Sequence, residues 1–139
     1  MELILLKKVE TLVRRIKIVY VATASREGVP HIAASEGLTF LGGDRIFFKA
    51  WFCLRTVENL LENPRLSLGV LDPQTQEGFQ ISGEMESIEK GAILNGFSPD
   101  QEQKWAGYPQ AEHQLSIRMK KISHLTSGPH SDEFFSIIA

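Results

Sequence analysis

The sequence predicts an all-β dominated (α+β) fold, in which about six antiparallel strands close, or nearly close, into a barrel with flanking helices. Two observations carry this prediction. Beyond the first 17 residues, the apolar period changes from that of a helix to that of strands rich in β-branched residues. Short glycine-containing turns then join consecutive strands, as in a meander. Closure is expected because it removes exposed strand edges.

The first element, residues 2–17, is predicted to be an amphipathic helix. Apolar residues recur at helical spacing along it, and charged residues occupy the other side. The apolar positions are Leu5, Val9, Leu12, Val13 and Ile16. We expect this face to pack against the sheet.

The next segments read as three consecutive antiparallel strands. Residues 18–25 and 30–41 are the first two, joined by a turn in which Gly28 is free to adopt positive φ. A second turn at Gly42 and Gly43 leads into the third strand, residues 45–50.

The rest of the chain alternates a helix with further strands. Residues 51–54 are expected to form a loop and residues 56–62 a short helix, which ends before Pro64 because proline disfavours helical geometry in the preceding residue. The remaining strands are predicted at 65–71, 79–88 and 115–125, with a short one at 134–138 and a helix start at 98–100.

Composition restricts the classes of function. The chain has 139 residues, which fits a single domain spanning 1–139, and a formal net charge of −2, which argues against broad nucleic-acid binding. Its single cysteine, Cys53, excludes an intrachain disulfide and a cysteine-based zinc site, and this suits a cytoplasmic location. No histidine spacing indicates a metal site, and no apolar run is long enough to cross a membrane.

The most informative segment for function is 49–64, KAWFCLRTVENLLENP. Arg55 stands directly before the predicted helix, and Thr56 is its expected N-cap. The first amides of a helix lack intrahelical partners and favour an anion, so this end, with the Arg55 guanidinium and the Thr56 hydroxyl, suits a phosphate monoester. Lys49 could reach the same anion. The alternative is that Thr56 only caps the helix and Arg55 is only solvated.

Several of these segments, in this order, resemble the pyridoxamine 5′-phosphate oxidase-like, FMN-binding split-barrel superfamily. They are the early strand VYVATAS, the acidic-glycine turn followed by Pro30-His31, and a basic residue leading into the N-L-x-x-N-P pattern at 59–64. The resemblance covers roughly residues 10–90 and implies an antiparallel split β-barrel.

The resemblance also implies a homodimer that holds FMN at its interface. Arg55 and Thr56 would hold the phosphate, and the flavin ring would lie along the second and third strands. The other cofactor-binding positions expected are Lys49, Ala34, Ser35, Ala50 and Trp51, with Gln80 and Trp105 as candidates for a wall supplied by the partner subunit. The chain lacks the Arg-Leu-x-Pro type C-terminus of vitamin-B6 oxidases, so a pyridoxamine phosphate substrate is not expected.

The function expected is that of an FMN-binding flavoprotein, an oxidoreductase acting on an unidentified small molecule. The catalytic residues cannot be assigned from the sequence, so enzyme activity is left open. Three alternatives remain: a non-catalytic FMN carrier or electron-transfer protein with a redox partner, a relative that binds a deazaflavin or haem, and a structural domain that has lost its cofactor.

Overall fold

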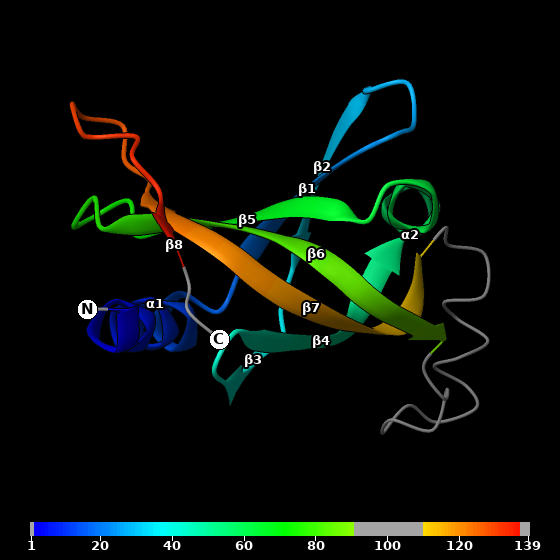
Figure 1. Ribbon diagram of the computed structural model, residues 1–139, viewed down its shortest axis with the longest axis horizontal. Coiled ribbons are helices and arrows are strands. Elements are labelled where there is room, and N and C mark those ends of the chain that lie inside the picture. The colour runs from blue at the N-terminus through cyan, green and yellow to red at the C-terminus, as the bar shows by residue number, and fades with distance from the viewer. Residues whose placement is uncertain (1, 91–109, 137–139) are drawn as a thin grey trace.

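A strongly curved antiparallel sheet with a helix toward each end forms the framework of the protein (Figure 1). The computed structural model describes residues 2–90 and 110–136, apart from the side chains at 2–3, 49–53, 90 and 110–112. Within these ranges the elements are α1 (Glu2–Ile16), β1 (Val19–Ala24), β2 (Pro30–Ser35), β3 (Leu38–Gly42), β4 (Arg45–Cys53), α2 (Leu54–Glu62), β5 (Arg65–Leu71), β6 (Gly78–Lys90), β7 (Gln110–His124) and β8 (Phe135–Ser136). Neither helix combines the length and apolar character needed to cross a membrane.

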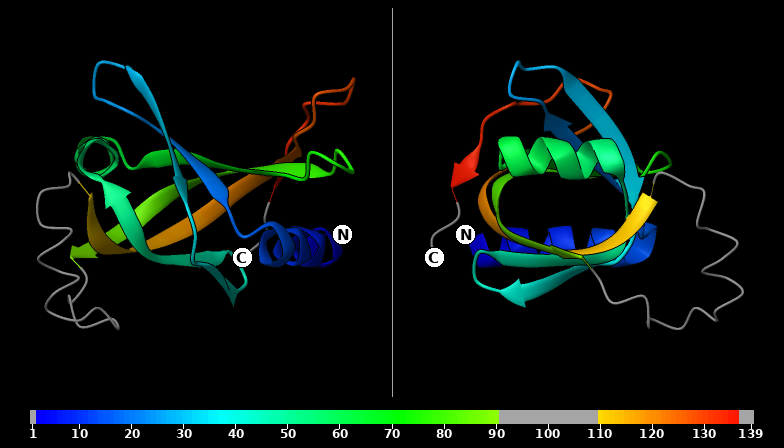
Figure 2. Two further views of the ribbon diagram at one scale, coloured as in Figure 1. Left: turned by 180° about the vertical axis from the view of Figure 1, so that it is seen from behind. Right: turned by 90° about the vertical axis from the view of Figure 1, so that its right-hand side faces the viewer.

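The strands follow the order β2-β1-β5-β6-β7-β4-β3, and β8 pairs with β7 beside this path. The sheet curls until β2 lies near β4 (Figure 2). Within the described residues no hydrogen-bonded ladder joins these two strands, so the barrel stays split at this seam. The predicted antiparallel split barrel with flanking helices is therefore confirmed.

The core fills the inside of the curved sheet with alternate residues of each strand. On β5, for example, Leu66, Leu68 and Val70 are buried. The predicted apolar face of α1 covers one end of this core, because Val9 and Leu12 are fully buried. Burying one such leucine side chain contributes about 1.5–3 kcal/mol.

The single strand predicted over residues 30–41 is wrong, because the chain divides there into β2 and β3. Gly37 has a φ of 94°, which a residue with a side chain rarely adopts and which redirects the chain. β2 can then pair with β1 while β3 pairs with β4. Together with the short β8, this break brings the described sheet to eight strands rather than about six.

The boundary between β4 and α2 also differs from the prediction. Residues 51–53, expected to be a loop, continue β4, because β7 pairs with this strand as far as Cys53 opposite Gln110. The helix begins directly afterwards at Leu54. Thr56 therefore lies inside the first turn of α2 and is not its N-cap.

Candidate functional site

The first turn of α2 begins where β4 ends, with no connecting residue between them. The backbone amides of Leu54 and Arg55 belong to this turn and have no acceptor within the helix. The helix dipole adds partial positive charge at the same end. The Arg55 side chain is exposed and forms no ion pair with any described residue. This end of α2 thus offers amide donors and a cation to solvent.

The opposite side of α2 packs against the barrel. Its buried residues are Thr56, Val57, Asn59 and Leu60. Thr56 is 0% exposed, and the residue has an interaction partner within the protein. Because it has no exposed surface, Thr56 presents neither its hydroxyl nor its backbone amide to solvent at this corner.

A buried hydrogen bond that sequence reasoning missed fixes the position of α2. The Asn59 Nδ2 atom donates to the Thr23 Oγ1 atom of β1 over 3.1 Å, and both residues are buried. Leaving either group buried without its partner would cost about 1–3 kcal/mol. The available signal was an asparagine on the apolar face of an amphipathic helix, three positions after Thr56.

The β2 positions predicted to lie beside a flavin ring are close to this corner, since β2 packs against both α2 and β4. Ala34 is exposed and lies opposite Tyr20 of β1. Ser35 is buried, and its Oγ atom lies 3.4 Å from the backbone oxygen of Glu36. The small side chain of Ala34 leaves the outer face of β2 open to a flat ligand.

The structure locates the other predicted positions less fully. Lys49, Ala50 and Trp51 lie on β4, which leads into the corner, and their side chains are not described. Trp105 lies outside the described residues. Gln80 is on β6, where its Nε2 atom donates to the Ser67 Oγ atom over 3.3 Å. The sheet order separates Gln80 from the β2 and β4 positions of the same subunit.

An apolar face covers the outer side of the β1–β2 hairpin. Tyr20 and Ile32 are 52% and 65% exposed, although both are large hydrophobic residues. They alternate with smaller apolar residues in register, and the cross-strand pairs are Tyr20 with Ala34, Ala22 with Ile32, and Ala24 with Pro30. Contiguous exposed apolar surface of this kind is typical of a protein–protein contact.

Comparisons with known proteins agree with this fold. An uncharacterized protein of Methanocaldococcus jannaschii is 27% identical over 129 residues, which is 86% of this chain and 80% of that protein. Among solved structures, a general stress protein 26-related protein from Clostridium acetobutylicum has a TM-score of 0.69 at 21% identity, covering 99% of this chain and 96% of that one. An FMN-binding protein from Syntrophomonas wolfei also has a TM-score of 0.69, at 20% identity, covering 93% and 91%.

Proteins described by other ligands share the fold. An F420 reductase matches with a TM-score of 0.59 at 19% identity, covering 82% of this chain and 94% of that one. HutZ, a haem storage protein from Vibrio cholerae, matches with a TM-score of 0.54 at 14% identity, covering 85% and 92%. At such identities the likeness shows the fold alone. The sequence itself matches the family model of pyridoxamine 5′-phosphate oxidase over residues 5–125, so the chain belongs to the pyridoxamine 5′-phosphate oxidase family.

Proposed function

We propose that the protein binds FMN and uses it for redox chemistry on a small molecule, with the phosphate held at the first turn of α2. The observation that carries the proposal is the exposed Arg55 next to the exposed Leu54, at the start of α2, where the first backbone amides have no acceptor within the helix. Together they supply charge-assisted and neutral hydrogen bonds to one phosphate group. Family membership and the FMN-binding protein of the same fold support the same ligand.

The residues around this corner fit a flavin. Ala34 presents a small side chain, so a planar ring can approach the backbone of β2. Flavin supplies hydride or electron transfer when it is bound, and the protein sets its position and environment. In this chain Arg55 and the first-turn amides bind the anionic end, and β2 with β4 orients the ring. Asn59, through Thr23, holds α2 against β1.

A homodimer is part of the proposal. The apolar outer face of the β1–β2 hairpin suits a second copy of the chain, because it would otherwise leave Tyr20 and Ile32 in water. Gln80 points outward from the sheet and, with Trp105, would then serve as the wall that the partner subunit supplies. Sedimentation of the wild type and an Ile32→Glu variant tests this contact. The wild type should be a dimer, and the variant should dissociate into monomers.

The binding experiment compares FMN titrations of the wild type, Arg55→Ala and Arg14→Ala. Arg14 is a matched control, because it is an exposed helix arginine near the C-terminal end of α1. Arg55→Ala should weaken FMN binding by about 1.5–3 kcal/mol, the scale of one charge-assisted hydrogen bond, whereas Arg14→Ala should not. Equal affinities for all three proteins would remove Arg55 from the site.

The fold neighbours also favour two other ligands in place of FMN, namely a deazaflavin and haem. Mass spectrometry of the ligand released from the purified, denatured protein identifies which of them is bound. Where the ligand is FMN, rapid bleaching of the flavin absorbance by NADH or NADPH indicates an enzyme. Reduction only through a redox partner indicates an electron-transfer protein.

A further inference from the structure

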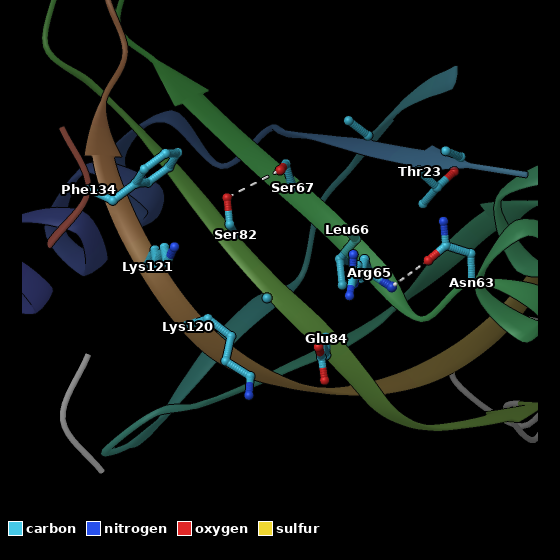
Figure 3. Close-up of a pocket in the computed structure, with 13 residues that line it drawn as sticks. Thr23, Asn63, Arg65, Leu66, Ser67, Ser82, Glu84, Lys120, Lys121 and Phe134 are labelled. Carbon is cyan, nitrogen blue, oxygen red and sulfur yellow. Dashed lines mark hydrogen bonds between the residues drawn. The ribbon is translucent and has the colours of Figure 1, made fainter. Parts of the chain in front are cut away.

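A second site of different composition lies on the outer face of the sheet, toward the C-terminal end of α2. It is a groove of about 580 Å³ between β1, β5, β6 and β7, within the size range of small-molecule sites (Figure 3). Its lining residues are Ala22, Thr23, Ala24, Asn63, Arg65, Leu66, Ser67, Ser82, Gly83, Glu84, Lys120, Lys121 and Phe134. Arg55 is not among them, and α2, nine residues long, extends about 13 Å from one end to the other.

A β-bulge in β7 supplies two of the cations of the groove. Lys121 lies opposite Ser82 and Met119 opposite Gly83, which leaves Lys120 as an extra residue without a cross-strand partner on β6. Lys120 and Lys121 are therefore both exposed, although strand alternation would turn one of them inward. Two adjacent lysines reach the same side of the sheet only because of this bulge.

Gly83 permits the close approach of strands at the bulge. A Cβ atom added there would lie 2.5 Å from the backbone oxygen of Arg118, a separation that side chains essentially never show. Only glycine therefore fits opposite the bulge without a shift of β7. The placement of the two lysines is thus fixed by the backbone rather than by flexible side chains alone.

The positive charge of the groove is only partly balanced within the described part of the protein, because Arg65 lies opposite Glu84 in the β5–β6 register. Lys120 and Lys121 form no ion pair there, and Glu84 is the single carboxylate among the lining residues. The Ser67 and Ser82 Oγ atoms lie 3.4 Å apart on the groove floor (Figure 3). One of these hydroxyls donates to the other, which leaves one O–H that can donate to a ligand. Like charges gathered this way repel one another, and a bound anion removes that cost.

The remaining lining is apolar and suits a flat body attached to the anion. Ala22 and Ala24, which also belong to the apolar outer face of the β1–β2 hairpin, line one side, and the Phe134 ring lies at the other, with its centroid 5.5 Å from the Lys121 Nζ atom. We propose that this groove binds a small organic anion, in which a phosphate or carboxylate is joined to a flat apolar body, at a site separate from the first turn of α2. The proposal does not rest on FMN binding.

The test uses 2-naphthyl phosphate as the probe, 2-naphthol as its uncharged counterpart and inorganic phosphate as the bare anion. Titration of isotope-labelled protein followed by NMR should move the backbone amide signals of Ser82, Gly83 and Lys121. We expect naphthyl phosphate to bind more tightly than either fragment, and added salt to weaken it. Signals that move only at Leu54 and Arg55, or naphthol binding equally well, would overturn the proposal.

The decisive variant is Lys120→Gln with Lys121→Gln, which should bind naphthyl phosphate about 10- to 100-fold more weakly. Lys7→Gln with Lys8→Gln is the matched control, because it removes two adjacent exposed lysines from α1 and changes the net charge equally. Arg65→Gln should also weaken naphthyl phosphate binding, and it tests the site independently because Arg65 lies on β5 rather than β7. Unchanged affinity in both the Lys120/Lys121 and Arg65 variants refutes the site.

Two further measurements separate this site from its alternatives. FMN affinity should be unchanged in the Lys120/Lys121 variant and reduced in Arg55→Ala, so failure of one proposal leaves the other standing. In sedimentation, the Lys120/Lys121 variant should have the same oligomeric state as the wild type. A changed assembly state with unchanged anion affinity would assign the groove to an interface between copies and overturn the proposal.

Discussion

The buried hydrogen bond between Asn59 and Thr23 gives the sharpest test of how α2 is held in place. Asn59→Ala removes the donor and leaves the Thr23 hydroxyl buried without it; Thr23→Val removes the acceptor and leaves the Asn59 amide unpaired. Each change should lower the free energy of unfolding by about 1–3 kcal/mol, the cost of an unsatisfied buried polar group. Asn59→Ala should be the larger of the two, since it also leaves a small cavity.

The measurement is a double-mutant cycle by urea unfolding, with and without saturating ligand. Because the second substitution removes a group that is already unpaired, the double variant should be more stable than the sum of the two losses predicts. A coupling of about 0.5–3 kcal/mol is expected for residues in direct contact. Additive losses, or a neutral Thr23→Val variant, would show that this hydrogen bond does not hold α2 to β1.

Two further predictions concern stability. Gly83→Ala should lower the free energy of unfolding by about 1–3 kcal/mol, because its new Cβ would meet the Arg118 carbonyl oxygen, and a variant as stable as the wild type in urea would contradict this close approach. The pKa of Asp72 lies below its ordinary value of 3.8, chiefly because the Gln74 backbone amide hydrogen-bonds the carboxylate and, to a smaller degree, because Arg15 lies beside it. A depressed pKa stabilises the fold above pH 3.8 and loses that effect as the pH falls through the lower folded value, so Asp72→Asn should reduce Tm at pH 7, and the difference from the wild type should shrink in acid. A Tm difference between wild type and Asp72→Asn that stays constant from pH 7 to acid would contradict the lowered pKa of Asp72.

Local signals were sufficient for the elements whose causes are local. The apolar positions of α1 recur at helical spacing, and Val9 and Leu12 are buried as that spacing predicts. Gly28 adopts a φ of 85° in the turn between β1 and β2. Pro64 follows the end of α2, because the geometry it imposes on Asn63 acts between neighbouring residues.

The errors arose where pairing with a distant strand overrides local preference. β4 continues through Cys53 because β7 pairs with it there. As a result α2 begins at Leu54, two residues before its predicted start at Thr56. The same long-range pairing divides residues 30–41, since β2 and β3 pair with different strands. No local pattern shows which strand a given segment will meet.

The features of the candidate sites likewise depend partly on local sequence and partly on long-range contacts. The sequence by itself determined the barrel class, its family and the basic residue at the start of α2, because periodicity, turn residues and the order of short motifs are written along the chain. Only the tertiary structure decided that Thr56 is buried, that Asn59 bonds to Thr23, and that a bulge opposite Gly83 turns both Lys120 and Lys121 toward the groove that Arg65 also lines. These contacts depend on strand register and sheet curvature, which bring together residues far apart in the sequence.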